Sequence, residues 1–373
     1  MKINQQLLLE NQSVNQDEID FEPNLILAFG GKSQLQSSSI QEMRLKYPQA
    51  IMAGCTTAGE IAKTSVYDDS LALNFIGFDN SSVIYREVNL ADDSASYSSG
   101  TELAQSFPEE GFVHCLVLSV GLNVNGTQLV SGLKENLPKG VALTGGLAAD
   151  GPNFNETFVL DNEGKTSNSK VIAVGFYGDL KIAYASLGGW DSFGLERTVT
   201  KSDNNVLYEL DGKPALELYK SFLGEEANNL PSSALLFPLS MRSEAGKTPL
   251  VRTILGISED DQSLTFAGDI PEGATVRLMK ANVDRLIDGA QEAASIIQQK
   301  KSEFALCISC VGRKLVLKQI VEEEVEACQE ELGENCTITG FYSYGEIAPF
   351  KEGAECELHN QTMTITSFSE IEG

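Results

Sequence analysis

One short pattern recurs near the two ends of this chain. Residues 54–61 read GCTTAGEI and residues 340–347 read GFYSYGEI, so both follow G-x-x-[Ser/Thr]-x-G-E-I. Each continues an apolar run with strand character, and residues 141–151 (VALTGGLAADG) run into a third turn of small residues. Glycine in such a turn permits a positive φ and lets another backbone or a ligand approach closely. We therefore predict that the chain repeats an αβ building unit.

Around these turns the segments keep one order: strand, helix, strand, hairpin. Residues 24–31 (NLILAFGG) predict a buried strand, and the serines that open residues 37–48 predict a capped helix. Residues 111–190 repeat this order, and the second half returns to it. The other expected elements are strand 50–61, hairpin 71–89, strand 111–122, helix 127–138, strand 141–151, hairpin 169–190, strand 302–317, helix 318–333, strand 337–350 and strand 355–368.

These elements predict an α/β fold class, with mixed sheets built from repeated strand-helix-strand-hairpin units in two pseudo-symmetric halves. Residues 1–21 are polar and acidic, and they predict a flexible N-terminal arm. The sequence changes character near residue 195, and Pro214 then marks a helix start. We expect a first domain at residues 22–225, with two units, and a second domain at residues 226–369.

Composition excludes several kinds of partner. The chain of 373 residues carries 27 basic and 53 acidic side chains, and its net charge of −26 repels phosphate backbones and anionic lipids. Its apolar runs fall short of the roughly 20 residues that cross a bilayer, and its start lacks the apolar core of a signal peptide. Seven cysteines in so long a chain do not suit a disulfide framework. We expect a cytoplasmic protein with reduced cysteines that binds neither nucleic acid nor membrane.

Catalytic motifs are missing from the sequence. It has no G-x-S-x-G elbow, no Walker loop, no H-E-x-x-H helix and no G-x-G-x-x-G after a strand. The two histidines, His114 and His359, have no nucleophile motif near them. We expect that the protein is not an enzyme.

Taken together, the motifs resemble those of FIST-domain proteins, in which an N-terminal FIST half precedes a C-terminal FIST half. The resemblance rests on GCTTAGEI, TGGLAADG, DGKPALELYKSFLG, SCVGRKLVL, GFYSYGEIAP and LHNQTMTITSF, and it covers nearly all of the chain after the first twenty residues. It implies an intracellular bacterial sensory module for small ligands. Because no kinase, cyclase or chemoreceptor segment is attached, it also implies output through a separate signalling enzyme, either a histidine kinase or a cyclic-di-GMP enzyme.

Similarity to stand-alone FIST proteins further implies haem as the cofactor and nitric oxide as the signal. Ligation of haem iron by imidazole would use His114 or His359. His114 lies inside an apolar strand, where we expect a buried neutral ring. His359 begins the last strand and is the candidate metal ligand. The alternative for His359 is a structural hydrogen bond to the turn at Gly345 and Glu346.

Ligands of open α/β sheets bind beyond the carboxyl ends of the strands, where the glycine turns are expected. Glu60 and Glu346 take equivalent places there, and each either contacts a ligand amine or caps turn amides. Arg313 follows a buried strand and is a candidate clamp for a carboxylate or a haem propionate, with an ordinary ion pair as the alternative. The predicted ligand-binding residues are Gly54, Glu60, Arg313, Tyr342, Tyr344, Gly345, Glu346 and His359.

Two other functions stay open. One is a sensor of an amino acid or another small metabolite, without haem, held by Arg313 and the two G-E-I turns. The other is a protein-interaction scaffold or homodimer that uses the acidic helix at residues 318–333 and exposed sheet edges. Cys307 and Cys310 face opposite sides of the predicted strand, where inert packing competes with redox sensing or thiolate ligation of haem.

Overall fold

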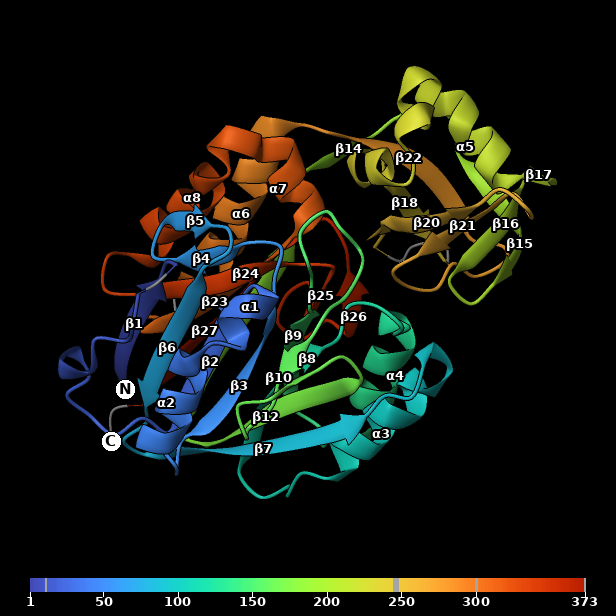
Figure 1. Cartoon of the computed structure of the whole chain (residues 1–373). Helices are drawn as coiled ribbons and strands as arrows, with labels where there is room; N and C mark the ends of the chain where they lie inside the picture. Colours follow the sequence, from blue (N-terminus) through green and yellow to red (C-terminus); the bar gives the residue numbers. More distant parts are fainter. Residues whose placement is uncertain (11, 244–247, 299–300, 372–373) are drawn as a thin grey trace.

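The computed structural model describes residues 1–10, 12–243, 248–298 and 301–371. Figure 1 shows a large body that contains both chain termini and a smaller body beside it. We call residues 1–189 and 282–371 the main body and residues 190–281 the small body. The main body contains the repeated units that the sequence predicts.

Within the described residues, three copies of one unit build the main body. The first comprises β2 (Leu25–Gly30), α1 (Lys32–Leu35), α2 (Ser38–Lys46), β3 (Ile51–Thr56), β4 (Glu60–Ala62), β5 (Ser65–Tyr67), β6 (Leu71–Gly77) and β7 (Ser81–Asn89). The second comprises α3 (Ser96–Gln105), β8 (Phe112–Ser119), α4 (Gly126–Asn136), β9 (Ala142–Leu147), β10 (Val159–Leu160), β11 (Thr166–Ser167), β12 (Lys170–Gly178) and β13 (Leu180–Leu187). The third comprises α6 (Val283–Gln298), β23 (Phe304–Cys310), α7 (Val311–Leu317), α8 (Glu322–Leu332), β24 (Thr337–Ser343), β25 (Gly345–Pro349), β26 (Cys356–His359) and β27 (Met363–Glu370).

Each unit contributes its hairpin to the sheet of another unit. The central parallel pairs are β2 with β3, β8 with β9 and β23 with β24. The hairpin β4–β5 extends the third unit's sheet at β24, β10–β11 extends the first unit's sheet at β3, and β25–β26 extends the second unit's sheet at β9. The final strands are exchanged too, since β7 pairs with β12 and β13 with β27. The exchange is cyclic, so no unit completes a sheet alone.

The N-terminal strand β1 (Lys2–Leu8) fills the remaining edge position. It pairs antiparallel with β6, from Lys2 opposite Gly77 to Leu8 opposite Leu71. In the other two units the corresponding edge is covered by the last strand of the preceding unit, since β7 pairs with β12 and β13 pairs with β27. β1 takes this place beside β6. The prediction that residues 1–21 form a flexible arm is wrong, because β1 satisfies the backbone groups of β6 and buries Leu8.

A ring of three backbone hydrogen bonds joins the turns after β3, β9 and β24. Ala58 N donates to Tyr342 O at 2.8 Å, and Ala149 N donates to Thr56 O at 2.9 Å. Tyr344 N donates to Leu147 O at 3.2 Å and closes the ring. The recurring turns therefore meet at one place, where each unit contributes one donor and one acceptor.

Glycine precedes each turn because the parallel neighbour lies too close for a side chain. A Cβ added to Gly54 would lie 2.0 Å from the carbonyl oxygen of Ala28. The corresponding distances are 1.9 Å from Gly145 to Val117 O and 1.7 Å from Gly340 to Cys307 O. The predicted role of Gly54 as a ligand contact is thus replaced by close packing of two strands.

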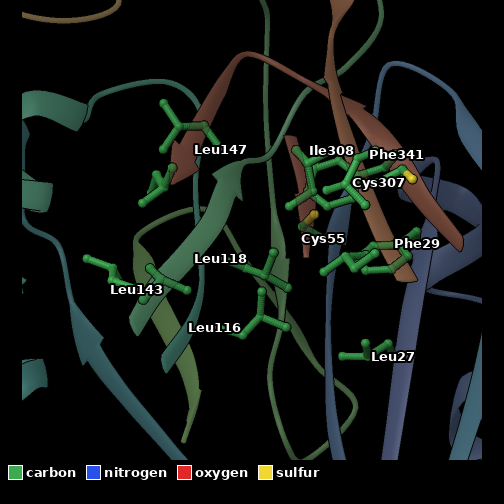
Figure 2. Close-up of a cluster of buried hydrophobic side chains, with 14 of the residues drawn as sticks. Leu27, Phe29, Cys55, Leu116, Leu118, Leu143, Leu147, Cys307, Ile308 and Phe341 are labelled. Carbon is green, nitrogen blue, oxygen red and sulfur yellow. The ribbon is translucent and has the colours of Figure 1, made fainter. Parts of the chain in front are cut away.

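The three sheets face one shared hydrophobic core. Figure 2 shows side chains of β2, β3, β8, β9, β23 and β24 converging on it. The rings of Phe29 and Phe341, from the first and third units, lie 4.8 Å apart between centroids. The outer face of the first sheet packs on α2 through Ile26, Ile40 and Met43. Helices α3 and α4 pack together beside the second sheet, and α6 and α8 pack together beside the third.

The small body has its own sheet and its own core. It comprises β14 (Trp190–Ser192), β15 (Arg197–Asp203), β16 (Val206–Leu210), β17 (Lys213–Pro214), α5 (Ala215–Leu223), β18 (Leu239–Arg242), β19 (Leu250–Arg252), β20 (Ile254–Ser258), β21 (Ser263–Phe266) and β22 (Thr275–Ala281). Its core runs from Val199 to Leu278, so the domain boundary expected at residues 225 and 226 falls inside this body.

The α/β class and the mixed sheets of repeated units are confirmed. The first half of the chain holds two units and the second half holds one. Among the described helices, none is long and apolar enough to cross a bilayer.

Deletion of residues 1–9 tests the role of β1. The deletion exposes the edge of β6 and removes a full antiparallel ladder, so we expect a loss of unfolding free energy on the order of a few kcal/mol. Urea unfolding followed by circular dichroism measures this loss, with Lys2→Gln at the exposed start of β1 as the control. An unchanged midpoint for the deletion would contradict the role of β1.

Candidate functional site

A cleft of about 750 Å³ lies at the carboxyl ends of β2 and β3. We call it the Glu60 cleft. It is lined by residues 31–34, 56–60, 68–69, 149–153 and 155–156. The first unit supplies the floor and one wall, and the loop after β9 supplies the opposite wall. This is the position that the sequence predicts for a ligand, and it adjoins the ring of turns.

Glu60 lies at the floor of the cleft with 1% of its surface exposed. One carboxylate oxygen accepts a hydrogen bond from the Thr57 hydroxyl, and the other accepts from Ser70 N at 3.0 Å and Ser70 Oγ at 2.7 Å. Burial raises the pKa of Glu60 to about 7, although these donors and Lys314 act to lower it. Glu60 therefore fixes the turn and also changes charge near neutral pH.

Glu346 makes the same contacts in the third unit, away from the cleft. Its carboxylate accepts from Ser343 Oγ at 2.7 Å, from Thr362 N at 3.1 Å and from Thr362 Oγ1 at 3.0 Å. Burial raises its pKa to about 8. Gly345 beside it lies in β25, opposite Leu147 of β9. Glu346 does not line the Glu60 cleft, so the two glutamates share a local role and not a pocket.

The second unit has no glutamate at this place and uses Asp150 instead. Six residues after the close-packed glycine, Gly151 stands where the other units have Glu60 and Glu346. The Asp150 carboxylate accepts from the backbone N–H groups of Phe154 at 3.0 Å, Asn155 at 2.9 Å and Glu156 at 3.0 Å. These bonds shape the loop that forms the far wall of the cleft.

Tyr344 supports this wall from behind. Its hydroxyl donates to Asp150, lies 2.9 Å from Gly151 O and accepts from Phe154 N at 3.2 Å. Its ring stacks on Phe154 with the centroids 4.4 Å apart. Tyr344 is therefore a positioning residue for the wall and does not line the cleft.

Lys314 of α7 connects the third unit to the cleft. Its ammonium donates to Ala58 O at 2.9 Å, pairs with Asp68 and lies 5.6 Å from the centre of the Tyr342 ring. Ala58 and Asp68 both line the cleft. All three units thus determine its shape.

Arg313 and Tyr342 belong to a buried polar cluster around Glu324 of α8. Arg313 donates to one carboxylate oxygen of Glu324 through Nε at 2.9 Å and Nη2 at 2.6 Å. The Tyr342 hydroxyl donates to the other oxygen at 2.6 Å, and Ser309 Oγ donates to it at 3.1 Å. Arg313 and Glu324 are fully buried. The geometry supports the ion-pair alternative for Arg313, because its guanidinium is already occupied.

His359 does not fit axial ligation of haem as it stands. Its Nε2 is 2.7 Å from Ala348 O, its ring packs against Phe350, and 1% of its surface is exposed. Burial lowers its pKa to about 4, so the ring is neutral and Nε2 carries the proton that it donates. The structural alternative, a tie between β26 and β25, agrees with its pairing opposite Glu346.

The other candidate haem ligands are buried in the core. His114 bonds Thr144 Oγ1 at 3.0 Å between Phe176 and Phe368, and burial lowers its pKa to about 3. Cys307 and Cys310 are free thiols with their pKa values raised, Cys307 by its contact with Cys328 and by burial, and Cys310 by burial. Among the residues that the structure describes, no group of three or more His, Cys, Asp or Glu side chains could hold a metal ion.

The Glu60 cleft is strongly acidic. Among the residues that the structure describes, five carboxylates line it, against the single ammonium of Lys32, which pairs with Glu156 at 2.6 Å. Asp68 pairs with Lys314, whereas Asp69 has no ion-pair partner within the described ranges. Such a field attracts an amine or another small cation. Sequence reasoning found Glu60 but missed Asp69 and Asp150, although YDD at residues 67–69 and AAD at residues 148–150 adjoin the predicted turns.

The chain is an α/β protein of exchanged units whose turns converge beside a cleft. The chain is a member of the FIST family, because residues 24–213 match the FIST N domain and residues 215–349 match the FIST C domain. FIST domains are associated with small-ligand sensing in signal transduction. The family resemblance and the presence of both halves are therefore confirmed.

The chain is also similar to a protein of Methanocaldococcus jannaschii named "Uncharacterized protein MJ1623". The two are 26% identical over 203 residues, which make up 50% of this chain and 38% of that protein. The match thus spans less than two thirds of the relative's length. The name of that protein states no activity.

Substitution of Arg313 tests the buried cluster. Arg313→Met leaves the Glu324 carboxylate buried without its cation, so we expect a loss of about 3 to 5 kcal/mol in unfolding free energy. The double variant Arg313→Met/Glu324→Gln should recover much of this loss. Lys165→Met, which breaks an exposed pair with Glu163, is the control and should lower the unfolding free energy far less than Arg313→Met does. Equal losses of unfolding free energy in Arg313→Met and Lys165→Met would contradict the structural role of Arg313.

Glu346→Gln tests the raised pKa of the second G-E-I glutamate. The folded pKa of about 8 lies above the unfolded value of roughly 4.3. The protonated carboxyl therefore makes its full contribution to the unfolding free energy below the unfolded pKa, and this contribution is lost as pH rises through the folded pKa of about 8. The unfolding free energy of the variant, relative to that of the wild type, should therefore increase as pH rises, by on the order of a few kcal/mol. Urea unfolding between about pH 5 and pH 9 measures this difference. A difference that stays constant with pH would show that Glu346 does not titrate in this range.

Proposed function

We propose that the protein binds a small amine-bearing metabolite in the Glu60 cleft and that occupancy of the cleft is passed to a separate signalling enzyme. The observation that carries this proposal is an acidic cleft of about 750 Å³ whose walls come from the turns of two units and are braced by the third. Its size suits an amino acid or a comparable metabolite.

The contacts around the cleft give a reason for an amine. Asp69 offers a carboxylate at the wall that has no ion-pair partner in the described part of the chain, and Glu60 is partly ionised near neutral pH because burial raises its pKa to about 7. An ammonium close to Glu60 would favour its ionised form. Ligand binding would then release a proton from Glu60 and tighten its bonds to Thr57 and Ser70.

Haem with nitric oxide stays a prediction from the family resemblance. The described residues do not support it, since His359, His114 and the cysteines are buried and bonded or packed in the core. We therefore rank the metabolite above haem. A histidine kinase or a cyclic-di-GMP enzyme as the partner, a non-enzymatic role, a cytoplasmic location and a bacterial source likewise stay predictions.

A thermal-stability screen with amino acids and small amines tests the proposal. Ligand that binds only the native state raises the melting temperature, and calorimetry then gives the affinity. Asp69→Asn should weaken binding at least about tenfold, because it removes a charged hydrogen-bond partner. Asp179→Asn, in the exposed turn between β12 and β13, is the matched control and should bind like the wild type. Equal affinities of both variants, or no stabilisation by any amine, would reject the proposal.

A further inference from the structure

A second cleft lies between the main body and the small body. It has a volume of about 490 Å³. The small body contributes Met241, Leu250, Arg252 and Asp269 to its lining, and the main body contributes Phe350 and Glu357 among others. We call it the Arg252 cleft. It is separate from the Glu60 cleft, since the two share no lining residue.

Hydrogen bonds fix the two bodies at the edge of this cleft. The Asp269 carboxylate accepts from Asn125 Nδ2 and Gln128 Nε2, each at 2.6 Å, at the start of α4. Asp269 N donates to Thr127 Oγ1 at 3.1 Å. Arg252 Nη1 donates to Leu358 O in β26 at 2.9 Å. These bonds therefore connect the small body to the main body directly beside the cleft.

Arg252 is the unusual member of the lining. It is 2% exposed, and among the described residues its side chain donates hydrogen bonds to the backbone oxygens of Val251, Asp269 and Leu358. Among the residues that the structure describes, no carboxylate lies within ion-pair distance of it. Burial lowers its pKa to about 10, although the nearby charges of Glu357 and Asp269 act to raise it. A buried guanidinium without an anion is costly, and such groups in proteins are normally paired.

The other buried arginine shows the contrast. Arg313 is equally inaccessible and pairs directly with Glu324. Arg313 lines neither cleft, whereas Arg252 borders an open one. Among the described residues, Arg252 thus lacks a directly paired carboxylate of the kind that Arg313 has in Glu324.

We propose that the Arg252 cleft binds a small monocarboxylate with an apolar tail, whose carboxylate pairs with the Arg252 guanidinium. A planar guanidinium matches a carboxylate with two parallel hydrogen bonds. Met241, Leu250 and Phe350 offer an apolar surface for the tail. Asp269, Glu355 and Glu357 also line the cleft, and their charges repel a dianion such as phosphate more strongly than a monoanion. This site is independent of the amine site proposed above.

Benzoate and hexanoate, each compared with its neutral amide, are the probes. The carboxylates should raise the melting temperature of the full chain, and benzamide, hexanamide and inorganic phosphate should not. Arg252→Met should abolish the response. Equal stabilisation by acid and amide, or none by either acid at millimolar concentration, would overturn the proposal.

A second variant keeps the test decisive if Arg252→Met does not fold. Ala354→Trp places a large side chain at the partly exposed rim and leaves Arg252 unchanged. It should fold and lose at least about tenfold in carboxylate affinity by steric exclusion. A response equal to that of the wild type would overturn the proposal. Asp69→Asn should keep the carboxylate response, which separates this site from the Glu60 cleft.

Discussion

The ring of three backbone hydrogen bonds among Ala58, Ala149 and Tyr344 and their acceptors is the constraint on which the main body depends. A backbone bond of this kind requires each turn to reach its neighbour at a fixed height and angle. The close-packed glycines allow this, since the parallel strands beneath the turns approach more closely than a Cβ permits. The sheets, the shared core and the cleft all follow from turns held at this one place.

Repetition of the turn has let the copies diverge in their surroundings. Glu60 keeps its hydroxyl and amide donors and faces an open cleft, whereas Glu346 keeps the same donors and is sealed inside the protein. In the second unit the glutamate is absent, and Asp150 orders the following loop. The same carboxylate therefore fixes a turn in both copies, and only in the first copy does it also line an open cleft.

Local pattern was enough to predict the strands, the units and the place of the cleft, because buried runs and glycine turns are properties of short segments. Pairing between units was not predictable, because β4 and β24 are far apart in the sequence and either could have paired within its own unit. β1 was misjudged for the same reason, since its partner β6 lies far along the chain and the consecutive polar residues Asn4, Gln5 and Gln6 give no alternating strand pattern. Arg313 was given a ligand role because it follows a buried strand, where the cleft was expected, and the sequence of the acidic helix did not indicate that Glu324 would be fully buried beside it.

The exchange of hairpins has a consequence for the order in which the molecule is made. The hairpin β4–β5 leaves the ribosome early, but its partner β24 lies in the last unit, so Glu60 cannot reach its final pairing opposite Phe341 until most of the chain has been synthesised. The first two units must wait in an incomplete state with sheet edges uncovered, which is the condition under which long chains aggregate. The first unit therefore completes its pairing only after the third unit has been synthesised, and a nascent chain that stops short of the third unit carries a finished sequence motif without a finished cleft.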